Sequence, residues 1–163
     1  MTRMTMNELP PSAQKVHDAA AVLGLDIAVR EMPDSTRTAE KAAAAVGVTV
    51  GQIVKSLVFV GATSGKPYLL LVSGTNRVNE AGVAAHLGEA LKRPDADAVR
   101  ALTGYAIGGI PPFGHDTPLA TYIDGDLLQY DVVWAAAGTP KAVFSAAPGR
   151  LKDATQAIVI DVK

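Results

Sequence analysis

The chain contains no cysteine among its 163 residues, so disulfide bonds, thiolate catalysis and cysteine-based metal sites are excluded. Aromatic side chains make up only 5% of the sequence, which argues against a stacking platform for nucleic-acid bases. Neither sign of charge dominates, because 15 Lys and Arg residues face 16 Asp and Glu residues. A broadly basic surface for DNA is therefore not expected, and any contact with RNA must be local.

Long hydrophobic runs are missing as well. The longest, at residues 68–72 and 132–137, are far shorter than the roughly 20 residues that span a bilayer. Residues 1–11 lack the apolar stretch of a signal peptide. We therefore expect a cytoplasmic protein that contacts no membrane. Residues 1–11 are expected to form a flexible arm, and residues 12–163 a single domain long enough to bury a core.

Hydrophobic periodicity and capping residues predict helices in the first two thirds of the chain and short strands towards its end. A hairpin loop at residues 61–65 separates the two clearest strands. Because helices and strands do not alternate regularly, the pattern favours an α+β fold with a mixed sheet. The expected helices are 12–23, 38–46, 79–87, 95–103 and a short turn at 148–152, and the expected strands are 27–32, 53–60, 67–72, 105–107, 120–123, 132–136, 142–145 and 157–162.

Lys55 interrupts an apolar strand. Strand alternation places it on the face that carries Ile53, Leu57 and Phe59. A lysine on an apolar face is costly unless its ammonium group reaches water or a partner. Two interpretations follow. Either Lys55 extends to water at the end of a strand, or it stands at the floor or rim of a pocket and holds an ester carbonyl or a phosphate.

Residues 108–115, with the sequence Gly-Gly-Ile-Pro-Pro-Phe-Gly-His, form the second informative segment. Gly108 and Gly109 permit positive φ and close backbone approach, whereas Pro111 and Pro112 stiffen the loop and lack N–H groups. The remaining N–H groups can converge to hold a carbonyl or an oxyanion. The alternative is a purely structural turn. The N–H groups in question belong to Gly109, Ile110, Phe113 and Gly114.

Several common catalytic patterns are absent from the sequence. The three histidines, His17, His86 and His115, lie far apart without ligand spacing, so no metal site is expected. No Gly-x-Ser-x-Gly segment supports a nucleophile elbow. Asp124 and Asp126 are interpreted as residues that solvate a turn rather than as a catalytic pair.

Seven segments taken together resemble the YbaK/EbsC family. This family includes the editing insertion domain of bacterial prolyl-tRNA synthetases and its free-standing relatives. The resemblance runs from about residue 12 to the C-terminus, with the segments in the same order. They are residues 38–43, 52–57, 74–79, 103–105, 108–114, 123–124 and 137–138.

The resemblance implies a mixed, partly curled, barrel-like sheet packed by several helices. It also implies a trans-editing deacylase that hydrolyses the ester between a wrong, small amino acid and a tRNA, with tRNA-Pro as one candidate. Water, a substrate hydroxyl or a substrate thiol would attack, and neither a metal nor an organic cofactor is expected. The partner is the acceptor end of the tRNA, which a synthetase or an elongation factor would deliver.

The family's strand lysine corresponds to Lys55, and its carbonyl-binding loop corresponds to residues 108–114. Pro111 departs from the family pattern, because cysteinyl-tRNA(Pro) deacylases commonly carry Ser there, so cysteine specificity is not implied. His115 either faces the pocket mouth or belongs to a solvated turn. We therefore expect catalysis to involve Lys55, Gly108 and Gly109, and substrate to contact Thr38, Ile110, Pro111, Pro112, Phe113, Gly114, His115 and Gly138.

Two other functions fit the same pocket. A non-catalytic module would bind an amino acid or aminoacyl-adenosine and regulate a synthetase. A third hypothesis is that the protein hydrolyses another small ester or amide. Lys55 together with the glycine-proline loop favours the deacylase.

Overall fold

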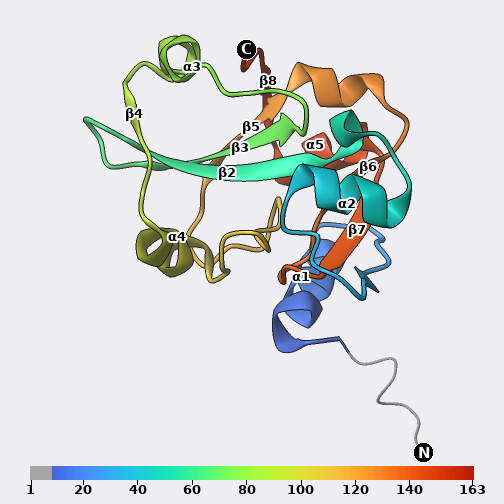
Figure 1. The fold of residues 1–163 in the computed structure, drawn as a ribbon. Coiled ribbons are helices and arrows are strands. Elements are labelled where there is room, and N and C mark those ends of the chain that lie inside the picture. The colour runs from blue at the N-terminus through green and yellow to red at the C-terminus, as the bar shows by residue number, and fades with distance from the viewer. Residues whose placement is uncertain (1–8) are drawn as a thin grey trace, which may run out of the picture.

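A computed structural model describes residues 9–163 (Figure 1). Residues 1–8 of the expected N-terminal arm lie outside the described residues, and Pro11 is already the first residue of helix α1 (Pro11–Val22). No helix within residues 9–163 is long and apolar enough to cross a membrane.

The strands form two sheets, in a molecule that mixes helices and strands as expected. The larger sheet has five strands in the order β4-β2-β3-β5-β8. Its β2–β3 and β2–β4 pairs are antiparallel, whereas β3–β5 and β5–β8 are parallel, so the predicted mixed sheet is confirmed. The strands are β2 (Val54–Gly61), β3 (Pro67–Ser73), β4 (Leu91–Lys92), β5 (Ala120–Asp124) and β8 (Ile158–Ile160).

The smaller sheet has three antiparallel strands in the order β1-β7-β6. It consists of β1 (Arg30–Glu31), β7 (Ala142–Ala146) and β6 (Val133–Ala136). The two sheets remain separate and open, so the partly curled, barrel-like form of a single sheet stays a prediction.

The two faces of the larger sheet bury different side chains. Val54 and Val58 of β2 point into the main core, where they join Phe144 of the smaller sheet. Leu57 and Phe59 of β2 point to the other face, where they pack in a second cluster with Val83 of α3 (Glu80–Leu87). This alternation follows from the two-residue period of a strand and places Lys55 on the second face.

Side-chain caps mark the start of α2 (Ala39–Val46), α3 and α4 (Ala96–Thr103), whereas α1 and α5 (Pro148–Thr155) begin at a proline without one. Thr38 caps α2 by accepting a hydrogen bond from the Lys41 N–H, and Gly47 ends it with φ of 76°. Asn79 caps α3 in the same way. The remaining helices are the short 3₁₀ helices η2 (Val50–Gln52) and η3 (Gly125–Gln129).

Two predicted strands differ from the structure. The strand expected at residues 105–107 is wrong, because the Gly109 N–H donates to the Ala106 carbonyl and turns the chain back. The strand expected at residues 27–32 is reduced to β1, since Ile27 is buried in the core without pairing in a ladder. The two-residue strand β4 was not expected, because nothing in its short sequence distinguishes it from a loop.

Candidate active site

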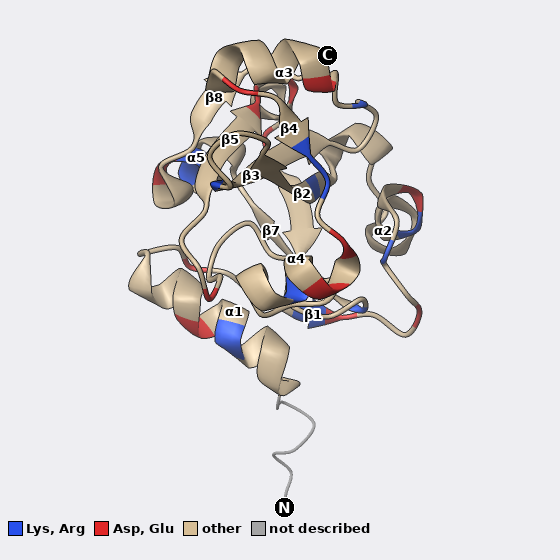
Figure 2. Cartoon of the chain, turned by 90° about the vertical axis from the view of Figure 1, so that its left-hand side faces the viewer, with Lys and Arg blue, Asp and Glu red and all other residues tan. Residues whose placement is uncertain are grey.

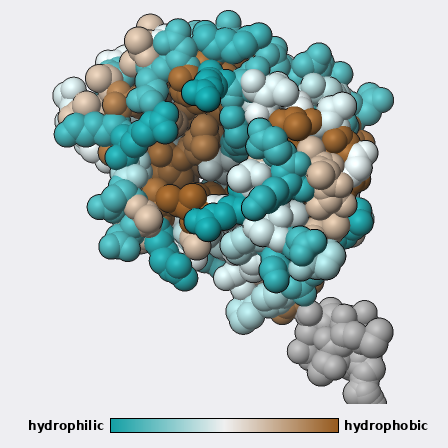
Figure 3. Space-filling view, in the orientation of Figure 1, coloured by the Kyte–Doolittle hydropathy of each residue, from teal (hydrophilic) through white to brown (hydrophobic). Residues whose placement is uncertain are grey.

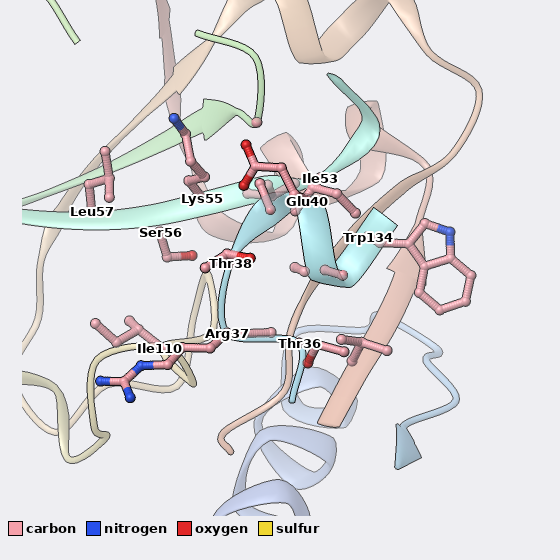
Figure 4. A pocket seen from close by; sticks show the side chains of 18 of the residues that line it. Thr36, Arg37, Thr38, Glu40, Ile53, Lys55, Ser56, Leu57, Ile110 and Trp134 are labelled. Carbon is pink, nitrogen blue, oxygen red and sulfur yellow. The ribbon is translucent and has the colours of Figure 1, made fainter. Parts of the chain in front are cut away.

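A cavity of about 340 Å³ opens where β2 and β6 separate. The two strands meet at a single bridge between Ile53 and Trp134 and then diverge. The segment that leads into α2, the first half of β2, the loop that contains Gly108 and Ile110, and β6 line the space (Figure 4). The volume lies near the lower end of the range for small-molecule sites. A hydrophobic patch bordered by hydrophilic side chains marks the face that carries β2 and α2 in Figure 3.

Lys55 lies at the rim of this cavity. It leaves β2 on the face that Leu57 and Phe59 share, and its Nζ donates to the backbone carbonyl of Asn76 at 2.5 Å. The side chain is half-buried, and burial lowers the pKa of Lys55. Glu40 opposes this shift, and Arg77 adds to it by charge repulsion. The result is a cation whose ammonium group is partly desolvated, which strengthens its interaction with a ligand anion.

A buried carboxylate holds the partner of Lys55 in place. Asp124 is 1% exposed and accepts hydrogen bonds from the Ser73 N–H at 3.1 Å and from Asn76 Nδ2 at 2.7 Å. Asn76 Nδ2 also donates to Asp126 at 2.8 Å. Both carboxylates therefore position the loop that receives Lys55, and the interpretation that they solvate a turn is wrong for the buried Asp124. That they are not a catalytic pair stays a prediction.

Ser56 lines the cavity from the other face of β2. Its Oγ is the one buried side-chain polar atom within residues 9–163 that has no hydrogen-bond partner. A buried hydroxyl without a partner costs roughly 1–3 kcal/mol. Such a group is rare in a folded protein, and it marks a place where a ligand can supply the missing bond.

The cavity brings together some of the residues expected at the site. Lys55, Thr38, Gly108 and Ile110 all line it, although they come from three separate stretches of sequence. Thr38 combines this position with its role as the cap of α2. The catalytic and binding roles assigned to these residues stay predictions.

Phe113 and Gly114 lie elsewhere in the structure. Phe113 is 5% exposed and packs on Phe144 in the main core, with ring centroids 5.6 Å apart. The Gly114 carbonyl accepts a hydrogen bond from the Tyr105 hydroxyl at 3.1 Å. The N–H groups of the loop therefore do not gather at the cavity as we expected, because the second half of the loop turns into the core. Pro111, Pro112, Phe113, Gly114, His115 and Gly138 are all absent from the cavity lining.

Gly109 is also absent from the lining, although both of its neighbours are present. Its N–H donates to the Ala106 carbonyl at 3.0 Å, and its carbonyl accepts from the Gly138 N–H at 2.9 Å. A Cβ on Gly109 would meet the backbone of Thr139 at 2.9 Å. The oxyanion role expected for the Gly109 N–H is therefore wrong, because this N–H is already engaged with Ala106. Gly109 and Gly138 instead allow their two loops to pack closely against each other.

His115 faces the protein rather than the cavity mouth. Its Nε2 lies 2.7 Å from the Pro111 carbonyl, so this nitrogen must carry the hydrogen and donate. The ring also meets Tyr105 edge-on. Burial lowers the pKa of His115, which keeps the ring neutral. Neither the solvated turn nor the pocket-facing orientation that the sequence allowed describes this contact.

The surface charges are mixed, as the composition predicts. Basic and acidic residues are interspersed over the face shown in Figure 2. Among the exposed basic residues, Arg93 pairs with Glu80 at 2.7 Å. Arg77 differs from it, since it lies close enough to Lys55 to lower that pKa. Arg77 therefore lies near Lys55, whereas Arg37 is the arginine that lines the cavity itself.

The sequence-based reading missed Ser56 and Asn76 as parts of the site. Ser56 followed Lys55 in an expected strand, and alternation alone could have placed it on the opposite face. Its missing partner is a tertiary feature that no local pattern reveals. Asn76 acts through its backbone carbonyl, which carries no signal in the sequence.

Comparisons with known proteins agree with this geometry. The sequence model of the family described as "Aminoacyl-tRNA editing domain" matches residues 33–154. A crystal structure of a "putative trans-editing enzyme for prolyl tRNA synthetase" is 52% identical and covers 96% of this chain and 99% of that one, with a TM-score of 0.91. The fold and its order of elements are therefore shared across nearly the whole chain.

Two curated proteins show the same relationship. The "Putative Cys-tRNA(Pro)/Cys-tRNA(Cys) deacylase EbsC" of Enterococcus faecalis is 29% identical over 130 residues, covering 72% of this chain and 77% of EbsC. The proline–tRNA ligase of Limosilactobacillus fermentum is 35% identical over 82 residues, covering 47% of this chain but 14% of the ligase. The expected family is thus confirmed: the chain belongs to the YbaK-like family of aminoacyl-tRNA editing domains.

Proposed function

We propose that this protein is a trans-editing deacylase that hydrolyses the ester linking a small, wrong amino acid to tRNA-Pro. The observation that carries the proposal is the half-buried Lys55 at the rim of a small apolar cavity, in a chain of the editing-domain family. The name printed for EbsC supports an aminoacyl-tRNA substrate, and that of the trans-editing relative supports a link with prolyl-tRNA synthetase.

The shape of the cavity favours a small acyl group. Aliphatic and alanine side chains, such as Ile53, Ile110, Ala135 and Val143, form most of its walls. An amino acid side chain that is too large for the cavity would be excluded by its size. Smaller side chains would all enter, and the cavity would discriminate among them only modestly. The cavity would therefore set an upper limit on the size of the amino acid side chain, while contacts outside the cavity would bind the acceptor end of the tRNA.

Lys55 would hold the phosphate of the terminal adenosine, with Arg77 beside it. Lys55 lines the cavity, and Arg77 lies close enough to Lys55 to affect its pKa. The nucleotide would remain outside the cavity while the aminoacyl group enters. Holding the ester in one orientation can supply several kcal/mol of the barrier reduction. The attacking group is water, a substrate hydroxyl or a substrate thiol, and the reaction would take place in the cytoplasm on tRNA delivered by a synthetase or an elongation factor.

A deacylation assay tests the proposal. Purified protein is mixed with tRNA-Pro charged with alanine, serine, cysteine, threonine or proline, and the remaining ester is followed with time. We expect faster hydrolysis of at least one ester of a small wrong amino acid than of the prolyl ester, with activity that co-elutes with the protein. Binding without hydrolysis of any panel member would instead favour the non-catalytic aminoacyl-binding module.

A further inference from the structure

We propose that Ser56 is a catalytic residue whose hydroxyl and backbone N–H bind the ester carbonyl oxygen while negative charge develops on it. The inference rests on the proposed deacylase function and adds the donors that stabilise its transition state. Three observations carry it: the Ser56 hydroxyl has no partner, the backbone of Ser56 faces the open edge of β2, and two other candidate donors, Gly109 and Lys55, are already engaged.

The Ser56 hydroxyl is buried without a partner in the described part of the chain. Figure 4 shows its oxygen projecting from β2 toward the side of the cavity on which Thr38 lies. The side chains of Thr36 and Lys55, which line the same cavity, both donate to backbone carbonyls. Since buried hydroxyls are nearly always paired, an oxygen of the ligand is the natural partner of Ser56.

The backbone of Ser56 faces the open edge of β2. In an antiparallel pair, the N–H and C=O groups of alternate residues bond to the partner strand, and those of the residues between them point to the opposite edge. The Gly61 N–H donates to the Lys66 carbonyl, and the Ile53 carbonyl accepts from the Gly74 N–H. The backbone N–H and C=O groups of the odd-numbered residues of β2 therefore point toward β3. Ser56 therefore faces the opposite edge, where β4 covers only the far end of the strand.

Two other candidate donors, the Gly109 N–H and the ammonium group of Lys55, are already engaged. The Gly109 N–H donates to the Ala106 carbonyl at 3.0 Å. Lys55 leaves β2 on the opposite face from Ser56 and donates to the Asn76 carbonyl. Ser56 thus places a side-chain donor and a backbone donor on one residue at one wall. A preorganised pair of this kind is what an oxyanion requires.

In the proposed step, the oxygen of a water molecule forms a bond to the ester carbon, and the π electron pair of the carbonyl moves onto the oxygen held by Ser56. When that pair returns, the bond to the ribose oxygen breaks. The ribose oxygen takes up one proton of the attacking water, and the released carboxylic acid loses the other to solvent. Ser56 keeps its own proton throughout.

Ser56 is a hydrogen-bond donor rather than a nucleophile. A serine nucleophile needs a base within hydrogen-bond reach. His115, which is half-buried, donates to the Pro111 carbonyl and does not line the cavity. The ammonium group of Lys55 lies on the other face of the strand.

Two variants of equal shape test the inference. Ser56→Thr keeps the hydroxyl and Ser56→Val replaces it by a methyl group, so both add the same bulk to β2. Their kcat and KM are measured on the panel member that the parent cleaves fastest, after thermal unfolding has shown that both are folded. We expect kcat of Ser56→Val to fall by about a hundredfold or more with little change in KM, because the donor acts only in the transition state. Ser56→Thr should stay within about tenfold of the parent on the same reasoning.

Each other outcome is decisive against the inference. If Ser56→Val is as active as Ser56→Thr, or if the loss lies in KM alone, the hydroxyl does not stabilise the transition state, while the deacylase function stands. An acyl group found on Ser56 by mass spectrometry after denaturation would make it a nucleophile. A parent that hydrolyses no member of the panel would overturn the proposed function and this inference with it.

Discussion

The two walls of the cavity differ in what their polar groups already bind. On the β2 wall, Ser56 has a hydroxyl without a partner and Lys55 reaches the rim. On the loop wall, Gly108 and Ile110 reach the space, while the rest of residues 108–115 is tied into the core. A rigid glycine-proline loop can thus shape a site without performing its chemistry. Variants of the loop should therefore lower stability, and variants of β2 should lower the rate.

The largest effect on stability is expected at Phe113. Phe113→Ala removes a ring that packs on Phe144 and leaves a cavity in the core, which should cost about 3–5 kcal/mol of unfolding free energy. Urea denaturation measures the loss, and Ile107→Ala, at an exposed position in the same segment, is the control. The comparison fails if Phe113→Ala keeps its stability and loses its activity.

The next effect concerns Gly109. A Cβ there would meet the Thr139 backbone at 2.9 Å, so Gly109→Ala should cost about 1–3 kcal/mol through overpacking. Gly149→Ala is the matched control, because its Cβ meets nothing within 4 Å and it lies in α5, where alanine is the better helix former. If Gly109→Ala kept the parental stability but reacted about a hundredfold more slowly, the catalytic donor would lie in the loop and not on β2.

The carboxylate behind Lys55 should influence the pH profile. The charge of Asp124 raises the pKa of Lys55, and the lysine loses its proton as the pH rises through that pKa. Asp124→Asn should therefore move the alkaline loss of activity to lower pH. Asp126→Asn removes a neighbouring charge that also binds Asn76 and should leave this limb in place. Equal shifts in the two variants would contradict the assignment.

The smallest effect is expected for His115. Burial lowers the pKa of His115 in the folded protein below its value of about 6.5 in the unfolded chain. At pH values between the two pKa values, the unfolded chain therefore binds more protons than the folded protein does. The contribution to stability is complete above about pH 6.5 and is lost as the pH falls below it. His115→Gln should flatten this dependence of the unfolding free energy on pH, which denaturation at several pH values measures. His17→Gln, at an exposed site in α1, should leave it unchanged.

Local features of the site could be predicted from the sequence. The β2–β3 hairpin and the cap at Thr38 depend on neighbouring residues, and both are confirmed. The position of Lys55 among apolar residues also follows from strand alternation. The family resemblance then supplied the class of fold, which the comparison with the trans-editing relative bears out.

The remaining features depend on contacts between distant segments. Ser56 faces a cavity because β6 diverges from β2 after the Ile53–Trp134 bridge, and β4 pairs only with the other end of the strand. Phe113 turns into the core because Phe144 lies there, 31 positions later in the chain. A pattern of glycines and prolines predicts that a loop is rigid, but it does not predict which side of the loop the core occupies.

The most direct test of the account compares two lysines of the same hairpin. Lys55→Ala and Lys66→Ala are assayed in single-turnover deacylation, with folding checked by circular dichroism. We expect the rate of Lys55→Ala to fall by about a hundredfold or more, because the ester loses the contact that orients it, whereas Lys66→Ala, in the exposed hairpin loop, keeps the parental rate. A folded Lys55→Ala protein as active as the parent would contradict the claim that the β2 wall carries the chemistry.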